Sequence, residues 1–214
     1  MLSVIVSVSD IHCFNNMLKI SLQETSEMLE SRGDYPLDIQ VVEGNSSIFS
    51  NYALGMERSR FPIKLFIHQD VHLIDTSWVD KILNTFCSFP SCGLIGLVGT
   101  TKLLNQGMWW ESGNNYIFGS LLSGKEKVDW RFGSVNDPME VECVDGFFLA
   151  TNTNIKWDTE LTGFHLYDLD YSREIKKAGY TIMVIPHKAW HIGEIRESTP
   201  DFKPYYKKWG FISD

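Results

Sequence analysis

Apolar and polar positions follow one another in blocks along the first hundred residues, and these blocks predict strands and helices in turn. Short apolar runs rich in β-branched residues predict buried strands at 2–9, 37–42, 65–67 and 94–98. Between them, apolar residues recur at helical spacing over 14–32, 48–58 and 78–86. Because strand and helix signals alternate, we expect a mostly parallel central sheet with right-handed crossovers, flanked by helices. The fold class is therefore α/β.

The pattern changes after residue 100. Residues 100–138 are poor in helix signals and rich in Gly, Asn, Ser and Trp, with short strands expected at 116–121 and 127–132. Three longer elements follow, namely a strand at 139–150, a helix at 168–178 and a last strand at 180–185. No repeat, low-complexity tract or linker divides the chain, so we expect one domain over residues 1–214.

Charge and cysteine usage narrow the function classes. A net charge of -8 argues against a general nucleic-acid binder, but a bound divalent cation can offset the charge of a nucleotide ligand. Cys87 and Cys92 could be bridged in an oxidising compartment, whereas buried reduced thiols are the alternative that we favour. The first residues lack a basic segment, and no apolar run approaches the length of a membrane span. We therefore expect a cytoplasmic location.

The strongest candidate chemistry follows the third predicted strand. Its apolar run ends abruptly in His68, Gln69, Asp70 and His72, just before Thr76, a candidate helix N-cap. In open α/β sheets, ligands bind outside the carboxyl ends of the strands. Asp70 and His72 alternate, so in an extended segment their side chains would point to the same side. The stretch predicts a site for a metal ion and a diphosphate; an ordinary polar loop is the alternative.

Further candidates lie in the second half of the chain. Asp145 and Gly146 interrupt an apolar strand, and a glycine there often marks the close approach of a ligand or of backbone. Asp168 opens a predicted helix, where the dipole favours an ionised carboxylate that could act as a general base; it could equally be an N-cap. His191 follows the last strand, and imidazole together with carboxylate suits Mn²⁺ or another first-row ion.

Other chemistries have no local signature. The chain contains no G-x-S-x-G, G-x-x-x-x-G-K-[ST], G-x-G-x-x-G or H-E-x-x-H motif. An activated serine hydrolase, a P-loop nucleotidase and a zincin are therefore not indicated.

The order of these motifs resembles the GT-A-fold glycosyltransferases of the family 2 type. In particular, it resembles a small bacterial group with a His-Gln-Asp-Val segment in place of a strict Asp-x-Asp. The resemblance spans nearly the whole chain. It rests on Ser7-Val-Ser-Asp10, Glu43, Asn51-Tyr-Ala-Leu-Gly55, His68-Gln-Asp-Val-His72, Gly107-Met-Trp-Trp110, Val144-Asp-Gly146, Phe164-His-Leu-Tyr-Asp-Leu-Asp170 and His191.

The resemblance implies roles for individual residues. Positions that would bind the donor nucleotide sugar are Ser9, Glu43, Asn51, Asp70, Asp145 and Gly146. Positions that would hold Mn²⁺ or Mg²⁺ are Asp70, His72 and His191. Asp168 would be the base that deprotonates the acceptor hydroxyl, and Trp109 and Trp110 would offer a stacking face for sugar or serve as core aromatics. Because His72 stands where a carboxylate is usual, the metal dependence stays open.

The function implied is an inverting, metal-dependent hexosyl transfer from a nucleotide-diphosphate sugar, and a UDP-sugar is the first candidate donor. Residues 1–100 would form the nucleotide-binding half, and 101–214 the acceptor and catalytic half. The acceptor would be a carbohydrate or a lipid-linked saccharide. The basic aromatic tail at 202–211 would either touch a membrane surface or pack as a short terminal helix.

Two other functions stay open. A nucleotidyltransferase of nucleotide-sugar synthesis would carry a glycine-rich basic loop after the first strand, where this chain has Ser9-Asp-Ile-His-Cys-Phe14. A non-catalytic carbohydrate- or nucleotide-binding module is the alternative from a different class.

Overall fold

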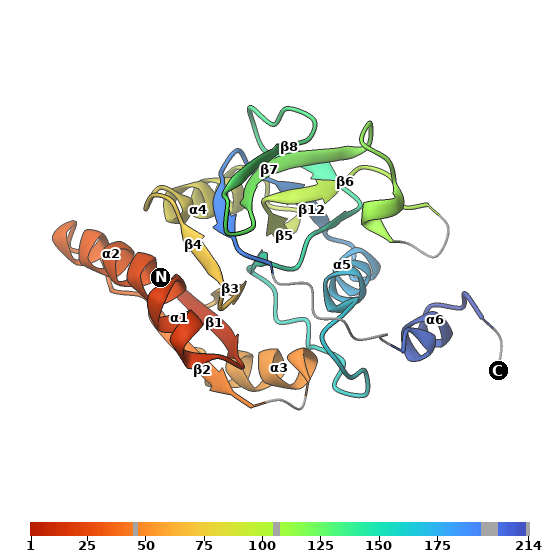
Figure 1. The fold of residues 1–214 in the computed structure, drawn as a ribbon, viewed down its shortest axis with the longest axis horizontal. Helices are drawn as coiled ribbons and strands as arrows, with labels where there is room; N and C mark the ends of the chain where they lie inside the picture. The colour runs from red at the N-terminus through yellow and green to blue at the C-terminus, as the bar shows by residue number, and fades with distance from the viewer. Residues whose placement is uncertain (45–46, 105–107, 194–200, 213–214) are drawn as a thin grey trace.

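The computed structural model describes residues 1–44, 47–104, 108–193 and 201–212 (Figure 1). A seven-stranded sheet lies at its centre, with the strand order β2-β1-β3-β11-β5-β12-β9. The strands are β1 (Leu2–Val8), β2 (Asp38–Glu43), β3 (Ile63–His68), β5 (Cys92–Gly96), β9 (Met139–Val141), β11 (Phe148–Thr151) and β12 (Thr181–Val184). The α/β class is confirmed.

The central sheet is mixed but mostly parallel. Strand β1 pairs in parallel with both β2 and β3, and β12 pairs in parallel with β5. Strand β11 lies antiparallel between β3 and β5, and β9 lies antiparallel at the edge beside β12. The carboxyl ends of β1 and β3 therefore meet at one edge, where ligands bind in such sheets.

A second sheet has six strands. Its order is β10-β6-β7-β13-β4, and β8 pairs with β7. These strands are β4 (Val71–Leu73), β6 (Val98–Thr100), β7 (Ile117–Ser123), β8 (Val128–Arg131), β10 (Cys143–Val144) and β13 (Ala189–His191). Because β13 pairs with β4, and His191 lies opposite Val71, the end of the chain's last strand is brought beside Asp70.

Helices cover both faces of the central sheet. They are α1 (Ile11–Asn16), α2 (Leu18–Ser31), α3 (Ile48–Arg58), α4 (Trp78–Ser88), α5 (Tyr167–Lys177) and α6 (Lys203–Lys208), with a 3₁₀ turn, η1, at Trp109–Glu111. Val4 and Val6 of β1 share a core with residues of α2 and α4, whereas Ile5 packs with residues of α3 and α5. This alternation follows the two-residue period of a strand that is buried on both faces.

Two predicted elements are divided in the structure. The helix expected at 14–32 breaks at Met17, and the shorter helix before it begins at Ile11 because the Asp10 carboxylate accepts hydrogen bonds from the backbone of His12 and Cys13. The strand expected at 139–150 becomes β9, β10 and β11, because its pieces pair with strands of two different sheets. Periodicity cannot reveal a strand that changes partners.

The tail forms α6, which packs against α5. Tyr205 is buried, and Trp209 and Phe211 pack in the same apolar cluster, so these aromatic side chains face the protein. Among the described residues, no helix combines the length and apolar character needed to span a bilayer. Cys92 and Cys143 are buried, but Cys87 is exposed, which corrects the expectation that it is a buried thiol.

Candidate metal and nucleotide-sugar site

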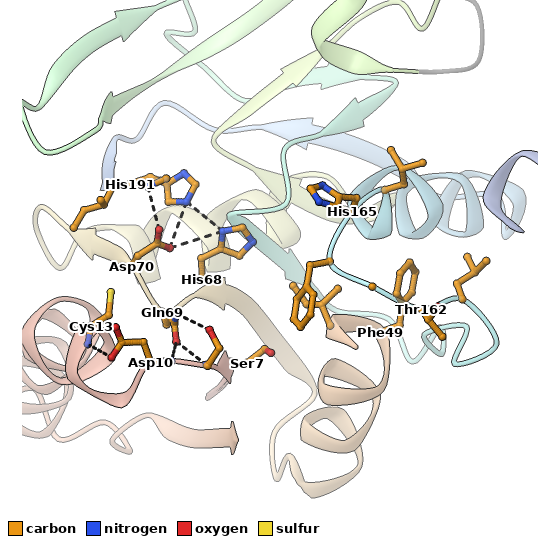
Figure 2. A pocket seen from close by; sticks show the side chains of 18 of the residues that line it. Ser7, Asp10, Cys13, Phe49, His68, Gln69, Asp70, Thr162, His165 and His191 are labelled. Carbon is orange, nitrogen blue, oxygen red and sulfur yellow. Dashed lines mark hydrogen bonds and ion pairs between the residues drawn. The ribbon is translucent and has the colours of Figure 1, made fainter. Parts of the chain in front are cut away.

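Three side chains that can bind a metal ion come together at the edge of the central sheet. His68 ends β3, Asp70 lies in the turn before β4, and His191 ends β13. One ligand atom from each lies within 4.8 Å of the other two (Figure 2). The group joins residues more than 120 positions apart, and the pairing of β13 with β4 accounts for it.

Hydrogen bonds and stacking orient this group. His191 Nε2 lies 3.2 Å from His68 Nδ1 and 3.4 Å from Asp70 Oδ1. The other carboxylate oxygen of Asp70 accepts a hydrogen bond from the backbone N–H of Gly193 at 3.0 Å. The His191 ring stacks on Phe147, with the ring centroids 5.2 Å apart. The three ligands are therefore held in place by neighbouring protein groups.

The electrostatics of the group suit a metal ligand set. Burial and the neighbouring charge of His191 lower the pKa of His68 to about 4, which leaves its imidazole neutral near pH 7. Burial acts to raise the pKa of Asp70, but the hydrogen bond and charge of His191 outweigh it and hold that pKa well below its usual range. A neutral imidazole and an ionised carboxylate are the protonation states that metal binding requires, and His68 and Asp70 have them. Burial acts to lower the pKa of His191, but the hydrogen bond and charge of Asp70 outweigh it and raise that pKa, so a metal ion would displace a proton from this ring. Two nitrogens and one carboxylate fit Mn²⁺ and similar first-row ions.

A cavity of about 730 Å³ opens beside this group, within the size range of ligand pockets. Its polar lining residues include Ser9, Asp10, His68, Asp70, Lys125 and His191. Its apolar lining residues include Ile48, Phe49, Phe164, Leu166, Phe202 and Tyr205. Figure 2 shows Phe49, Thr162 and His165 across the cavity from Asp10 and Cys13. Both halves of the chain contribute to the lining.

Gln69 ties the ends of two strands together. Its side-chain oxygen accepts hydrogen bonds from the backbone N–H groups of Ser9 at 2.8 Å and Asp10 at 2.9 Å. Its side-chain nitrogen donates to Ser9 Oγ at 3.1 Å. Gln69 thereby holds Ser9 in the wall of the cavity, which is a role that the sequence pattern did not reveal.

Two other residues expected near the nucleoside lie outside the cavity lining. Asn51 is buried, and its amide donates to Ser7 Oγ at 2.8 Å and to the Gly44 carbonyl at 3.2 Å. It therefore ties α3 to the ends of β1 and β2. Glu43 is exposed at the end of β2.

Gly146 lies where a side chain could not fit. A Cβ at this position would overlap the ring and hydroxyl of Tyr167. That hydroxyl is hydrogen-bonded to Nε2 of His68. Gly146 lies in the turn between β10 and β11 rather than within a strand, and the group that approaches it is a side chain, not the ligand or backbone that the sequence suggested. This side chain supports the metal-ligand group.

Asp168 lies in the first turn of α5, next to this support. It is 7% exposed, and its carboxylate accepts hydrogen bonds from the backbone N–H groups of Gly146 at 3.2 Å and Leu169 at 2.9 Å. Burial and the charge of Asp145 raise the pKa of Asp168 to about 7, against the effect of a hydrogen bond from the side chain of Trp109. Asp168 is not among the residues that line the cavity, so the structure brings Asp70 and His191 together but keeps Asp168 behind Gly146.

Comparison with known proteins adds an independent observation. A family model described as "Glycosyltransferase like family" matches residues 3–209. The chain belongs to this glycosyltransferase family. A search of curated proteins gave no match.

Solved structures with the same fold are glycosyltransferases of the GT-A type, which confirms the expected fold. The structure of S. aureus TarS 1-349 in complex with UDP-GlcNAc has a TM-score of 0.57 at 11% identity over 96% of this chain and 63% of its own. The mannosyltransferase PcManGT from Pyrobaculum calidifontis, in complex with GDP-Man and Mn²⁺, has a TM-score of 0.56 at 10% identity over 92% of this chain and 58% of its own.

A third structure, GalNAc-T7 with UDP, GalNAc and Mn²⁺, has a TM-score of 0.53 at 9% identity. The match covers 95% of this chain and 45% of GalNAc-T7, so this chain spans about half the length of that relative. At such identities the likeness concerns the fold alone.

His72 does not join His68, Asp70 and His191. Its Nδ1 lies 3.4 Å from the carbonyl oxygen of Met17. Its ring meets the Trp190 ring edge to face, with the centroids 6.3 Å apart. The turn between β3 and β4 breaks the strand alternation that the sequence argument assumed. The alternation argument also overlooked His68, although its place at the end of a buried strand, two residues before Asp70, was a usable signal.

The two tryptophans of the middle segment differ in their surroundings. Trp109 is partly buried and contributes the hydrogen bond to Asp168, whereas Trp110 is 48% exposed. Their rings meet edge to face, with the centroids 5.8 Å apart. Gly107, which begins the same motif, lies outside the described residues.

Proposed function

We propose that this chain transfers a sugar from a nucleoside-diphosphate sugar to an acceptor hydroxyl, with inversion at the anomeric carbon. The observation that carries the proposal is the group of His68, Asp70 and His191 beside a ligand-sized cavity at the carboxyl ends of β1 and β3. Membership of a glycosyltransferase family supports the reaction class.

The donor's diphosphate would lie against this group. His68, Asp70 and His191 would hold a divalent cation, with Mn²⁺ the first candidate and Mg²⁺ the second, and His68 takes the place that the sequence argument gave to His72. Three protein ligands leave coordination positions for diphosphate oxygens. Such a cation would offset the negative charge that the departing nucleoside diphosphate acquires.

The nucleoside would occupy the side of the cavity near the end of β1. Ser9 lies in that wall, positioned by Gln69. Neighbours of the same fold were solved with UDP-GlcNAc and with GDP-Man and Mn²⁺, which supports a nucleotide-sugar donor without choosing the base. A UDP-sugar is the first donor to test.

Asp168 is the proposed base. In an inverting transfer, the acceptor oxygen attacks the anomeric carbon, the bond from that carbon to the diphosphate oxygen breaks, and the base takes the hydroxyl proton. A carboxyl group with a pKa of about 7 holds this proton well near neutral pH. Asp170 is the less suitable neighbour, because Lys208 Nζ lies 2.8 Å from its carboxylate and Trp209 donates a hydrogen bond to it.

The half-exposed ring of Trp110 would stack against the acceptor sugar, and Trp109 would orient the base. Asp145, half-buried beside Asp168, would border the reacting sugar together with Gly146. The acceptor would be a carbohydrate or a lipid-linked saccharide, and the reaction would take place in the cytoplasm.

Incubation with UDP-Glc, UDP-GlcNAc and GDP-Man in the presence of Mn²⁺ tests the proposal. Nucleotide release that needs both Mn²⁺ and an acceptor is the expected result. Asp168→Asn should reduce release at least a hundredfold, while the exposed Asp137→Asn should leave it unchanged. Tight donor binding without release would favour a binding module instead. Pyrophosphate formation from a sugar phosphate and a nucleoside triphosphate would favour a nucleotidyltransferase.

A further inference from the structure

The cavity lining combines polar and apolar side chains, and the C-terminal tail contributes some of the apolar ones. Phe202, Pro204 and Tyr205 of the tail line the cavity together with Phe164 and Leu166. The polar part of the lining includes the metal-capable side chains and Ser9. A ligand that fills the cavity would therefore need a polar part and an apolar part.

Ion pairs of Lys208 and a hydrogen bond of Trp209 hold the tail on α5. Lys208 Nζ lies 2.8 Å from Asp158, 2.8 Å from Asp170 and 3.1 Å from Glu174. Trp209 Nε1 donates to Asp170 at 2.8 Å. Asp170 is almost fully buried. An unpaired carboxylate there would lower the stability of the fold strongly, and Lys208 compensates its charge.

Further contacts of Phe202 and Tyr205 attach the tail residues that line the cavity to the rest of the protein. The Phe202 ring meets the His165 ring edge to face, with the centroids 6.2 Å apart. The Tyr205 hydroxyl accepts a hydrogen bond from Arg173 Nε of α5 at 3.0 Å. Tyr205 also packs in one apolar cluster with Leu166 and Leu169, which lie two residues before and one residue after Asp168. The apolar wall is thus attached to the segment that carries the proposed base.

We propose that Phe202, Pro204 and Tyr205 form an acceptor subsite for an apolar group attached to the acceptor sugar, and that Lys208 is the residue that positions this wall. The inference rests on the proposed function, because it assigns the polar part of the cavity lining to the donor. Tyr205 packs with Leu166 and Leu169, which lie close to Asp168 in the chain, and we therefore assign the apolar group to the acceptor. The acceptor class is therefore a glycoside or glycosyl phosphate with an alkyl or prenyl chain.

Binding of alkyl glucosides tests this subsite without needing the true acceptor. Octyl β-glucoside, kept below its micelle concentration, should bind about tenfold or more tightly than methyl β-glucoside, because part of its chain is buried against the wall. Phe202→Ala should remove most of that difference. Lys208→Met should also reduce the difference in affinity between the two glucosides, whereas Lys208→Arg should keep that difference. Lys203→Ala, on the exposed side of α6, is the matched control and should behave as the wild type.

Competition between octyl glucoside and UDP shows whether the aromatic wall binds the acceptor or the nucleotide. Octyl glucoside should still bind when UDP and Mn²⁺ saturate the protein. Displacement of octyl glucoside by UDP would assign the aromatic wall to the nucleobase and overturn the inference. Equal binding of the two glucosides, or unchanged octyl glucoside binding by Phe202→Ala, would overturn it too. Failure of UDP to bind at all would count against the proposed function, whereas the octyl-to-methyl difference and its loss in Phe202→Ala would still report on the wall alone.

Discussion

The α-carbon of Gly146 lies against the ring of Tyr167 so closely that an added methyl group would overlap the phenol hydroxyl. The same hydroxyl is hydrogen-bonded to His68, one of the three metal-capable residues. The segment after β10, the start of α5 and the end of β3 are therefore packed as one unit. The absence of a side chain at Gly146 leaves room for the Tyr167 ring in this position.

Gly146→Ala should destabilise the protein, because Tyr167 is buried and has little room to retreat. Overpacking of this kind costs about 1–3 kcal/mol in the free energy of unfolding, which urea titration measures. In a Tyr167→Leu background the overlapping atoms are absent, so the same alanine should cost less. Additive effects of the two substitutions would show that the contact does not limit packing at this site.

The raised pKa of Asp168 predicts how stability changes with pH. Because the folded protein holds this proton up to about pH 7, whereas the unfolded chain releases it near pH 4, the protonated carboxyl contributes stability at low pH. That contribution is lost as the pH rises from about 4 to about 7, and it amounts to a few kcal/mol. Asp168→Asn removes the loss, so this variant should be more stable than the wild type at pH 8. Urea unfolding at pH 5 and pH 8 measures the difference, and Asp137→Asn should follow the wild type.

The same group predicts the pH dependence of transfer. A base must be deprotonated to accept the acceptor's proton, so kcat/KM should rise tenfold per pH unit below about pH 7 and level off above it. Initial rates at subsaturating acceptor between pH 5 and pH 9 measure this profile. A profile that is flat from pH 5 to pH 8 would remove Asp168 as the base.

Trp109→Phe should shift that profile to higher pH. The side chain of Trp109 donates a hydrogen bond that lowers the pKa of Asp168, and phenylalanine cannot donate it. Trp110→Phe keeps an aromatic ring beside the same segment without contacting the base through this bond, so its profile should keep the wild-type midpoint. Identical midpoints in all three proteins would separate Trp109 from the base.

Much of the fold could be predicted from hydrophobic periodicity, because the regular elements bury one face or both. Helix α3 begins and ends where its pattern does, at Ile48 and Arg58. The breaks could not be predicted. Met17 leaves the helical conformation for a single residue, and the changes of partner after Val141 depend on pairing with distant strands.

The site could be predicted only in part. Asp70 and His191 were recognised from their positions after strands, and the pairing of β13 with β4 joins them. Gln69 and Tyr167 gave no signal, because their roles consist of contacts to residues 60 and 99 positions away. His72 was favoured over His68 because the turn after β3 was not visible in the alternation of side chains.

The most direct test of the account is calorimetric binding of UDP and GDP with and without Mn²⁺. We expect at least one of the two to bind in the presence of Mn²⁺ and to lose binding in EDTA. His68→Ala, Asp70→Asn and His191→Ala should each weaken Mn²⁺-dependent binding about tenfold or more, while His12→Ala, an exposed histidine outside the cavity lining, should bind as the wild type. Nucleotide binding that is equally tight in EDTA, or unchanged in all three variants, would contradict the assignment of His68, Asp70 and His191 as the metal and diphosphate site.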